Sequence, residues 1–333
     1  MLIHQEIFIK KLKSRVHNKL SFIDLISSIL QINYDAAYRR VNNKTSLSLN
    51  ESIVLAKHFN VSLNTLYSVG EKNSVLVGKT QEINSATDLE SYLKTSYRNF
   101  EPWLKKEGAH VSYCANDLPI FYFLNNSKLS KFKLYAWLNL LDPTFSTVKM
   151  PFIRFKPKVS LLKAAEIFGK TYSKFNITEI WNENILNKTI KQIYHYNEIG
   201  LLSLDDALEI TSDLEKIIKK IESDARAGKR QDNSKSTSFT LYHNEIMSLG
   251  NNVLIKTSDS KIAMSPYSLL SYYIVSNPET CNDLEKYFKK QLESSNLLSS
   301  TENKGRSLFF NKLYMILNRL KVRLKIDDQL PLI

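Results

Sequence analysis

Apolar residues recur at helical spacing between positions 21 and 41, with one interruption. Ser21 fits the N-cap of a first helix whose apolar face holds Phe22, Leu25, Ile26 and Ile29. Residues 31–33 break this pattern, and Asn33 fits the N-cap of a second helix with an inward face of Tyr34, Ala37, Tyr38 and Val41. The small side chain of Ala37 permits two helices to cross closely. The segment therefore predicts two short helices joined by a tight turn.

The opposite face of the second helix is polar and basic. It holds Asp35, Ala36, Arg39 and Arg40, which places two adjacent arginines away from the core. Residues 42–45 tolerate a left-handed conformation and offer hydrogen-bond donors where this helix ends. Two further helices are expected on either side, one over 5–18 with Ile7, Phe8, Leu12 and Val16 inward, and one with Leu49, Ile53, Leu55, Ala56 and Phe59 inward. A last short helix follows from 61 to 66.

The order of these helices, the run YDAAYRRVNNKTSLSL and the ending AKHFNVSLNTLY are similar to the Cro/cI-type (XRE) helix-turn-helix family, and within it to the BetR-like regulators. The resemblance covers about residues 5–68. It implies that the second helix, 34–42, enters the major groove of DNA and that Asn43, Lys44 and Thr45 contact the backbone. The inter-helix turn has Leu30 and Gln31 in place of the family's glycine. Either Gln31 takes the left-handed conformation or the turn has a longer form.

The resemblance also implies roles for individual side chains. Arg39 and Arg40 are the expected groove-facing cations, reading guanine or gripping phosphate. Asn33, Tyr34 and Asp35 lie at the start of the helix, where base contacts in this family concentrate. Asp35 either accepts from a cytosine amino group or stabilises the helix N-terminus. One such domain covers a half-site, so that a homodimer on double-stranded DNA is expected.

The rest of the chain predicts a larger second domain. We expect a helix-turn-helix domain over 1–69, a linker over 70–85 with a short strand at 75–77, and a sensing or oligomerisation domain over 86–333. Helical spacing is found over 86–106, 161–175, 183–199, 203–225, 279–294 and 302–325, and strand patterns over 110–115, 239–247, 252–257 and 261–264. Residues 226–237 are polar and basic and are expected to form a mobile loop. The fold class is therefore mostly α, with a helical N-terminal bundle and a mainly α (α+β) second domain that holds a small β-hairpin or sheet.

Three helical segments of this second domain allow more than one interpretation. The aromatic segment 120–141 forms either part of the core or a groove for a small ligand or peptide. The apolar stripe of 203–225, closed by Gly228, either packs inside the domain or forms a dimer seam. The basic face of the last helix is either solvated or in contact with DNA. An unidentified small-molecule or peptide effector is an expected partner of this domain.

Composition and charge change this picture only slightly. The chain has 333 residues and a net charge of +13, which favours a polyanionic partner, although an AT-rich genome produces lysine-rich proteins without one. Two cysteines, Cys114 and Cys281, indicate a reducing compartment. The N-terminus does not have the order of a signal peptide, and no apolar run is long enough to span a membrane. We therefore expect a cytoplasmic protein without a membrane partner.

Candidate catalytic chemistry is sparse. The six histidines have no metal-type spacing, and His243 with Glu245 is the one pair that fits a ligand or acid-base pair, with a surface pair as the alternative. A phosphate-binding loop, a nucleophile elbow and a Cys/His pair are all missing from the sequence. We therefore expect no enzyme, no metal and no cofactor. The sequence predicts a sequence-specific DNA-binding transcriptional regulator; the alternative is a protein-interaction module whose activity lies in the second domain.

Overall fold

The computed structural model describes residues 2–16, 21–67, 75–232, 235–246, 250–299 and 304–329. The chain divides into two compact units, Met1–Leu76 and Val77–Ile333. Strand β1 (Gly78–Lys79) pairs with a strand of the second unit, and Ile83 is buried there. The second half of the expected linker 70–85 therefore belongs to the second unit, and its strand lies at 78–79 instead of 75–77. The fold is mostly α, with a mixed sheet in the second unit, as the sequence predicted.

The first unit is a bundle of short helices around one small core. Its elements are α1 (Ile3–Lys13), α2 (Phe22–Leu30), α3 (Tyr34–Val41), α4 (Leu49–His58) and α5 (Leu63–Tyr67). The core consists of Phe8, Ile9, Leu12, Ile26, Ala37, Val41, Leu55, Ala56 and Val61. Three residues of α1 and α4 that were expected inside are exposed, Ile7 at 43%, Leu49 at 74% and Ile53 at 37%. Ile9 occupies the core in place of Ile7, because the buried side of α1 is centred on Phe8 and Leu12.

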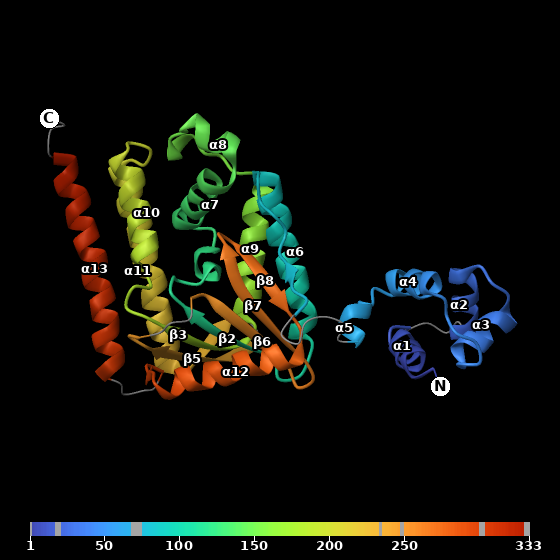
Figure 1. Ribbon diagram of the computed structural model, residues 1–333. Coiled ribbons are helices and arrows are strands. Elements are labelled where there is room, and N and C mark those ends of the chain that lie inside the picture. Colours follow the sequence, from blue (N-terminus) through green and yellow to red (C-terminus); the bar gives the residue numbers. More distant parts are fainter. Residues whose placement is uncertain are drawn as a thin grey trace. The chain divides into compact units, whose positions relative to one another are not determined.

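A mixed sheet forms the centre of the second unit (Figure 1). The strands run in the order β1-β8-β7-β6-β2-β3-β5-β4, and β9 pairs with β5. The three central strands β2, β3 and β5 are parallel, and the other pairs are antiparallel. The bounds of these strands are β2 (His110–Ala115), β3 (Asn176–Trp181), β4 (Lys229–Asp232), β5 (Lys235–His243), β6 (Asn252–Lys256), β7 (Lys261–Ser268), β8 (Ser271–Val275) and β9 (Asn296–Leu297).

Helices cover both faces of this sheet. Alternate residues of β2 and β6 point to opposite sides: Val111 and Tyr113 join the large core, whereas Cys114 and Leu254 join a smaller core. Helix α12 (Pro278–Glu293) covers the smaller core through Cys281 and Phe288. The other face is covered by α6 (Ala86–Leu104), α7 (Lys128–Leu141), α9 (Val159–Ser173), α11 (Leu204–Ala227) and α13 (Lys304–Gln329). The remaining helices are η1 (Ile120–Phe123), α8 (Pro143–Val148), η2 (Phe152–Arg154) and α10 (Asn187–Glu198).

Helix α11 has the bounds and caps that the sequence predicted. Ser203 caps its start by accepting from the N–H of Asp206, and Gly228 ends it in the left-handed conformation. Its apolar stripe is buried against the second-unit core. The stripe is therefore not a dimer seam. The aromatic segment 120–141 is likewise core, with Phe132, Tyr135 and Trp137 buried.

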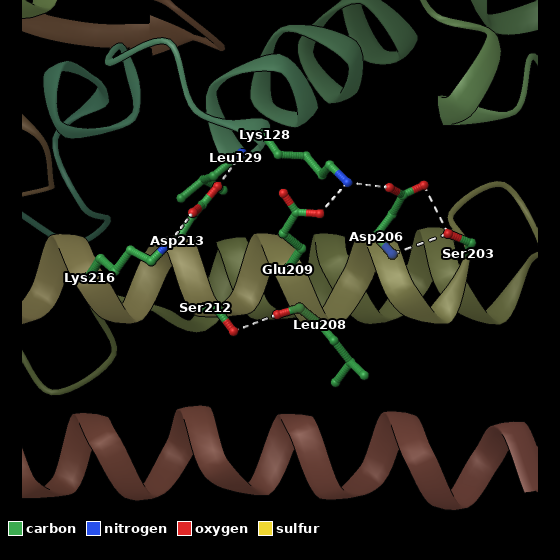
Figure 2. A network of polar contacts seen from close by, with 9 residues as sticks. All are labelled: Lys128, Leu129, Ser203, Asp206, Leu208, Glu209, Ser212, Asp213 and Lys216. Carbon is green, nitrogen blue, oxygen red and sulfur yellow. Dashed lines mark hydrogen bonds and ion pairs between the residues drawn. The ribbon is translucent and has the colours of Figure 1, made fainter.

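A polar network fixes α7 on α11 (Figure 2). At the start of α7, the Lys128 ammonium donates to Asp206 at 2.9 Å and to Glu209. Asp213 accepts from the N–H of Leu129 at 3.4 Å. These carboxylates lie where the free N–H groups and the positive dipole end of α7 attract negative charge. The network holds the aromatic face of α7 in the core.

Several segments of the second unit differ from the sequence prediction. Strand β3 was not expected, and the expected loop 226–237 contains β4 and the start of β5; the short strands β8 and β9 were not expected either. At β3 and β4, a buried polar cluster takes up the charged side chains of Glu179 and Arg230. No helix in the described part of the chain is both long enough and apolar enough to cross a membrane.

Candidate nucleic-acid interface

The turn between α2 and α3 forms without a glycine. Gln31 takes the left-handed conformation, with φ 54° and ψ 42°, which confirms the first of the two expected forms of the turn. The Ser27 hydroxyl donates to the carbonyl of Ile32 at 2.6 Å and closes the turn. The Asn33 side chain then accepts from the N–H of Ala36 at 2.8 Å and starts α3 as predicted. The angle between the two helices is thereby set by local hydrogen bonds.

Helix α3 buries a narrow face and exposes a wide one. Ala37 and Val41 are the buried residues, whereas Tyr34 is 49% exposed and Tyr38 is 41% exposed. The prediction that both tyrosines face inward is therefore wrong. An eight-residue helix presents only about two turns, and its inner side is filled by the small Ala37 and Val41. The phenol rings therefore lie on the outer side.

The two adjacent arginines have different surroundings. Arg40 Nη2 lies 2.8 Å from Glu51 Oε1 of α4, and Arg40 Nη1 donates to the Ala36 carbonyl at 3.2 Å. Glu51 therefore binds the guanidinium of Arg40 within the unit, and the expectation that Arg40 faces the groove stays a prediction. Arg39 is exposed, and its side chain has no hydrogen bond or ion pair within the described residues.

Glu51 also caps its own helix. Its carboxylate accepts from the N–H of Ser48 at 2.8 Å, while the Ser48 hydroxyl accepts from the N–H of Glu51 at 3.2 Å. This is a capping box. Burial alone would raise the pKa of Glu51, but the hydrogen bonds from Arg40 and Ser48 outweigh it and lower the pKa below its ordinary value. The carboxylate thus joins the end of α3 to the start of α4.

Gln5 of α1 holds the loop between α3 and α4. Its Nε2 donates to the carbonyls of Arg40 at 2.8 Å and Thr45 at 2.9 Å, and its Oε1 accepts from the N–H of Leu47 at 2.7 Å. Sequence reasoning missed this residue. A single glutamine about 40 positions from its partners carries no local signal, since periodicity reports only neighbours within a few turns.

The loop after α3 places small donors beside the exposed helix face. Asn43 is left-handed, with φ 57°, and Asn42 Nδ2 donates to the Tyr38 carbonyl at 2.9 Å. The Lys44 ammonium lies 5.4 Å from the centre of the Tyr38 ring. Lys44 and Thr45 are exposed, as a contact with a phosphate backbone would require.

We call the outer side of α3 the α3 face, defined as Tyr34, Asp35, Tyr38, Arg39 and Asn42, all of which are exposed. Of the predicted site residues, the structure thus brings Tyr34, Asp35 and Arg39 together with the loop residues Asn43, Lys44 and Thr45. Asn33 uses its side chain as a cap, Ala36 is half-buried and Arg40 is bound to Glu51. Sequence reasoning missed Tyr38 as a residue of this face. Its spacing from Tyr34, Ala37 and Val41 also fits the inward face of a helix, where it was expected.

The α3 face has the chemistry of a groove reader. It offers two phenol hydroxyls, a guanidinium, a carboxylate and an amide, spaced at one helical turn. A guanidinium donates two parallel hydrogen bonds to a guanine, and hydroxyls and ammonium groups bind phosphate. The helix beneath is held at both ends, by Asn33 at its start and by Gln5 and Glu51 at its end. Such a face can present side chains to DNA with little loss of conformational entropy.

A polar cluster surrounds Glu179 in the core of the second unit. Glu179 is fully buried and accepts from Tyr172 at 2.6 Å and Trp181 at 2.7 Å, with Tyr122 and Arg230 beside it. Burial, followed by the charge of Glu179, raises the pKa of Tyr172. Every partner of this carboxylate comes from the core, so the cluster joins β3 to its neighbours and leaves no open coordination position.

The His243 and Glu245 pair does not form. His243 is buried at the end of β5 and packs against Phe309 with ring centres 4.7 Å apart, whereas Glu245 lies in the exposed turn that follows. Burial lowers the pKa of His243. In the described part of the chain, no group of three or more His, Cys, Asp or Glu residues is placed to hold a metal ion.

A small apolar cavity lies between the sheet and helices α6 and α9. Its volume is about 40 Å³, and its lining includes Tyr92, Phe100, Phe121, Tyr172 and Tyr272. Ligand sites are typically several hundred cubic ångströms. The cavity has room for a water molecule but not for an effector.

Comparisons with known proteins do not define a family for this chain. No family model matches it, and no curated protein matches it. Among solved structures, it is similar to the one described as "Structure of TrmBL2, an archaeal chromatin protein, shows a novel mode of DNA binding", at 9% identity over 86% of this chain and 80% of that chain, with a TM-score of 0.23. A TM-score this low defines neither the fold nor the function of this chain.

Proposed function

We propose that this chain is a sequence-specific DNA-binding transcriptional regulator of the helix-turn-helix type, with α3 in the major groove. One observation carries the proposal: Tyr34, Asp35, Tyr38 and Arg39 are exposed together on a helix that is braced from α1 and α4. The three hydrogen bonds from Gln5 hold the loop after α3, so that the helix face and the loop keep a fixed arrangement. The resemblance to the Cro/cI-type regulators supports the same assignment.

The proposal gives each residue one role. Arg39 reads a guanine, and Tyr34, Asp35 and Tyr38 contact neighbouring bases or phosphates. Asn43, Lys44 and Thr45 bind the backbone on one side of the groove. Arg40 acts as a positioning residue, because its guanidinium is bound to Glu51. The second unit serves dimerisation or the sensing of a small-molecule or peptide effector, and no catalytic step is assigned to the chain.

Salt-dependent binding to random-sequence duplex DNA tests the proposal. The logarithm of the binding constant should fall linearly with the logarithm of the salt concentration. The reason is that lysine and arginine side chains of the bound protein displace counterions from the DNA phosphates. Lys44→Ala should reduce the slope by about one unit. Lys163→Ala is the matched control, since Lys163 is an exposed lysine of α9 in the second unit. Absence of salt-dependent binding by folded protein would favour the protein-interaction module instead.

A further inference from the structure

Helix α13 has two apolar faces. One is buried in the second-unit core and consists of Phe309, Phe310, Leu313, Leu317, Leu320 and Leu324. The helix lies at an edge of this unit, beside α10 and α11 (Figure 1). Its other side is free of the core. A helix that packs on one side only normally has a polar outer side.

The outer side of α13 carries an apolar stripe. Leu308, Met315, Val322 and Ile326 are 57%, 55%, 57% and 51% exposed. The first three are spaced by seven residues, which is the repeat of a helix that pairs with another helix. A shallow depression lies along the C-terminal part of the stripe, between Asn318 and Ile326. Exposed apolar side chains aligned along one side of a helix favour an interaction surface.

We propose that this stripe is the seam of a homodimer in which the α13 helices of two copies pair in parallel and in register. Leu308, Met315 and Val322 would each pack against the same residue of the second copy. The proposed function calls for a dimer, and this inference names the surface that makes it. Self-association is measured without DNA. The hypothesis of DNA binding by α3 and the hypothesis of a dimer through α13 can therefore fail independently of each other.

The polar residues beside the stripe favour a second copy and set its direction. Asn311 and Asn318 lie on one flank, and Lys312 and Arg319 lie on the other, as their positions on a helix of 3.6 residues per turn require. A parallel two-fold pair brings opposite flanks together, so that each cation lies beside an asparagine, whose carbonyl accepts from it. An antiparallel two-fold pair would bring Lys312 beside Arg319 of the second copy. Like charges at that distance repel, which favours the parallel pair over the antiparallel one.

The flank cation Lys312 and two further cations of α13 have partners within the unit. Lys321 binds Glu215 at 2.6 Å, Lys312 lies 3.7 Å from Glu183, and the Arg323 guanidinium stacks 4.1 Å from the Tyr194 ring. Arg323 also lies 3.6 Å from Asp327. These contacts reduce the repulsion between two basic helices, so the apolar seam can bring them together.

Sedimentation of the full chain over a range of concentrations tests the seam. The wild type should dimerise, and Met315→Glu should weaken the dimer by about 100-fold or more, because two carboxylates would meet at the centre of the seam. Ile153→Glu is the matched control: Ile153 is 76% exposed on η2, away from α13, and this variant should dimerise like the wild type. A monomeric wild type, or a dimer that Met315→Glu leaves intact, would overturn the proposal.

A cross-link tests the direction. Val322→Cys should form an intermolecular disulfide under mild oxidation, because a parallel pair in register places the two substituted positions at one level. An antiparallel pair centred on Met315 would separate them by about 20 Å at 1.5 Å per residue. The native Cys114 and Cys281 are fully buried and do not compete. A dimer sensitive to Met315→Glu but without this disulfide would overturn the parallel arrangement.

Discussion

Arg40 and Glu51 form an ion pair at 2.8 Å that joins the end of α3 to the first turn of α4. Both side chains are about one-fifth exposed, at 20% and 19%, so that solvent screens the pair only in part. Its neighbour Arg39 points to solvent. One of the two arginines therefore fixes the position of α3, and the other is exposed and has no partner within the described residues.

Replacing the carboxylate of Glu51 should make the first unit less stable in a pH-dependent way. Glu51→Gln weakens the contact with Arg40 and half of the capping box, at a cost of about 1–2 kcal/mol. The pKa of Glu51 is lowered in the folded protein, so its contribution is present above the unfolded pKa and is lost as pH falls through the folded pKa. Hydrogen exchange measures the free energy of opening at α3 and α4. The difference in this free energy between the wild type and Glu51→Gln should shrink below about pH 4.

The control for this prediction is Glu6→Gln, since Glu6 is an exposed carboxylate in the first turn of α1. It should change the opening free energy by only a few tenths of a kcal/mol. An equal effect of the two variants at every pH would contradict the role given to Glu51.

Gln5 should affect DNA binding without touching DNA. Gln5→Ala leaves two carbonyls and the Leu47 N–H of the α3–α4 loop without their partner. Affinity should fall on all sequences to a similar degree, by about 1 kcal/mol, because the loop loses its position but no base contact is removed. Gln5→Glu keeps the acceptor for Leu47 but sets a carboxylate oxygen against the two carbonyls, so it should cost at least as much as Gln5→Ala. A change in base preference with Gln5→Ala would show instead that Gln5 contacts the bases.

Lys133 should lower the stability of the second unit below about pH 10. The side chain is 5% exposed, donates to Gln192 at 2.6 Å and lies 4.5 Å from the Phe123 ring. Burial lowers its pKa to about 7. The unfolded chain therefore binds more protons between about pH 7 and 10, and this group makes stability rise with pH over that window.

Lys133→Met removes this penalty and keeps a side chain of similar length. It should stabilise the second unit at pH 7, and the gain should disappear near pH 10, as thermal unfolding measured at several pH values would show. Lys163→Met, on the exposed side of α9, is the control without a pH-dependent effect. A loss of stability with Lys133→Met at pH 7 would mean that the hydrogen bond to Gln192 outweighs the cost of burial.

The sequence was informative wherever structure is set by local interactions. Asn33, Ser203 and Gly228 cap their helices as predicted, and Gln31 is left-handed as one of the two expected turns requires. A cap forms with residues three positions away, and local spacing contains that information. The stripe of α11 was predicted for the same reason, although its burial decided against a dimer seam.

The misses come from contacts between distant residues. Strand β3 was not predicted because Glu179 occupies an inward position, and its partners Tyr122 and Arg230 lie about 50 residues away on either side. Arg230 in turn made β4 resemble a polar loop. In the candidate site, the ion pair of Arg40 with Glu51 and the exposure of Tyr38 were both missed. Periodicity cannot reveal these partners.

Selection of bound sequences from a random duplex pool, at near-physiological salt, tests the central claim most directly. The wild type and Lys163→Ala should both enrich a two-fold symmetric motif, with one half-site for each α3. Arg39→Ala should lose discrimination at one base position in each half-site, by about 1–3 kcal/mol, and keep the rest of the motif. No enriched motif from folded wild-type protein, or an unchanged motif with Arg39→Ala, would contradict the role given to the α3 face.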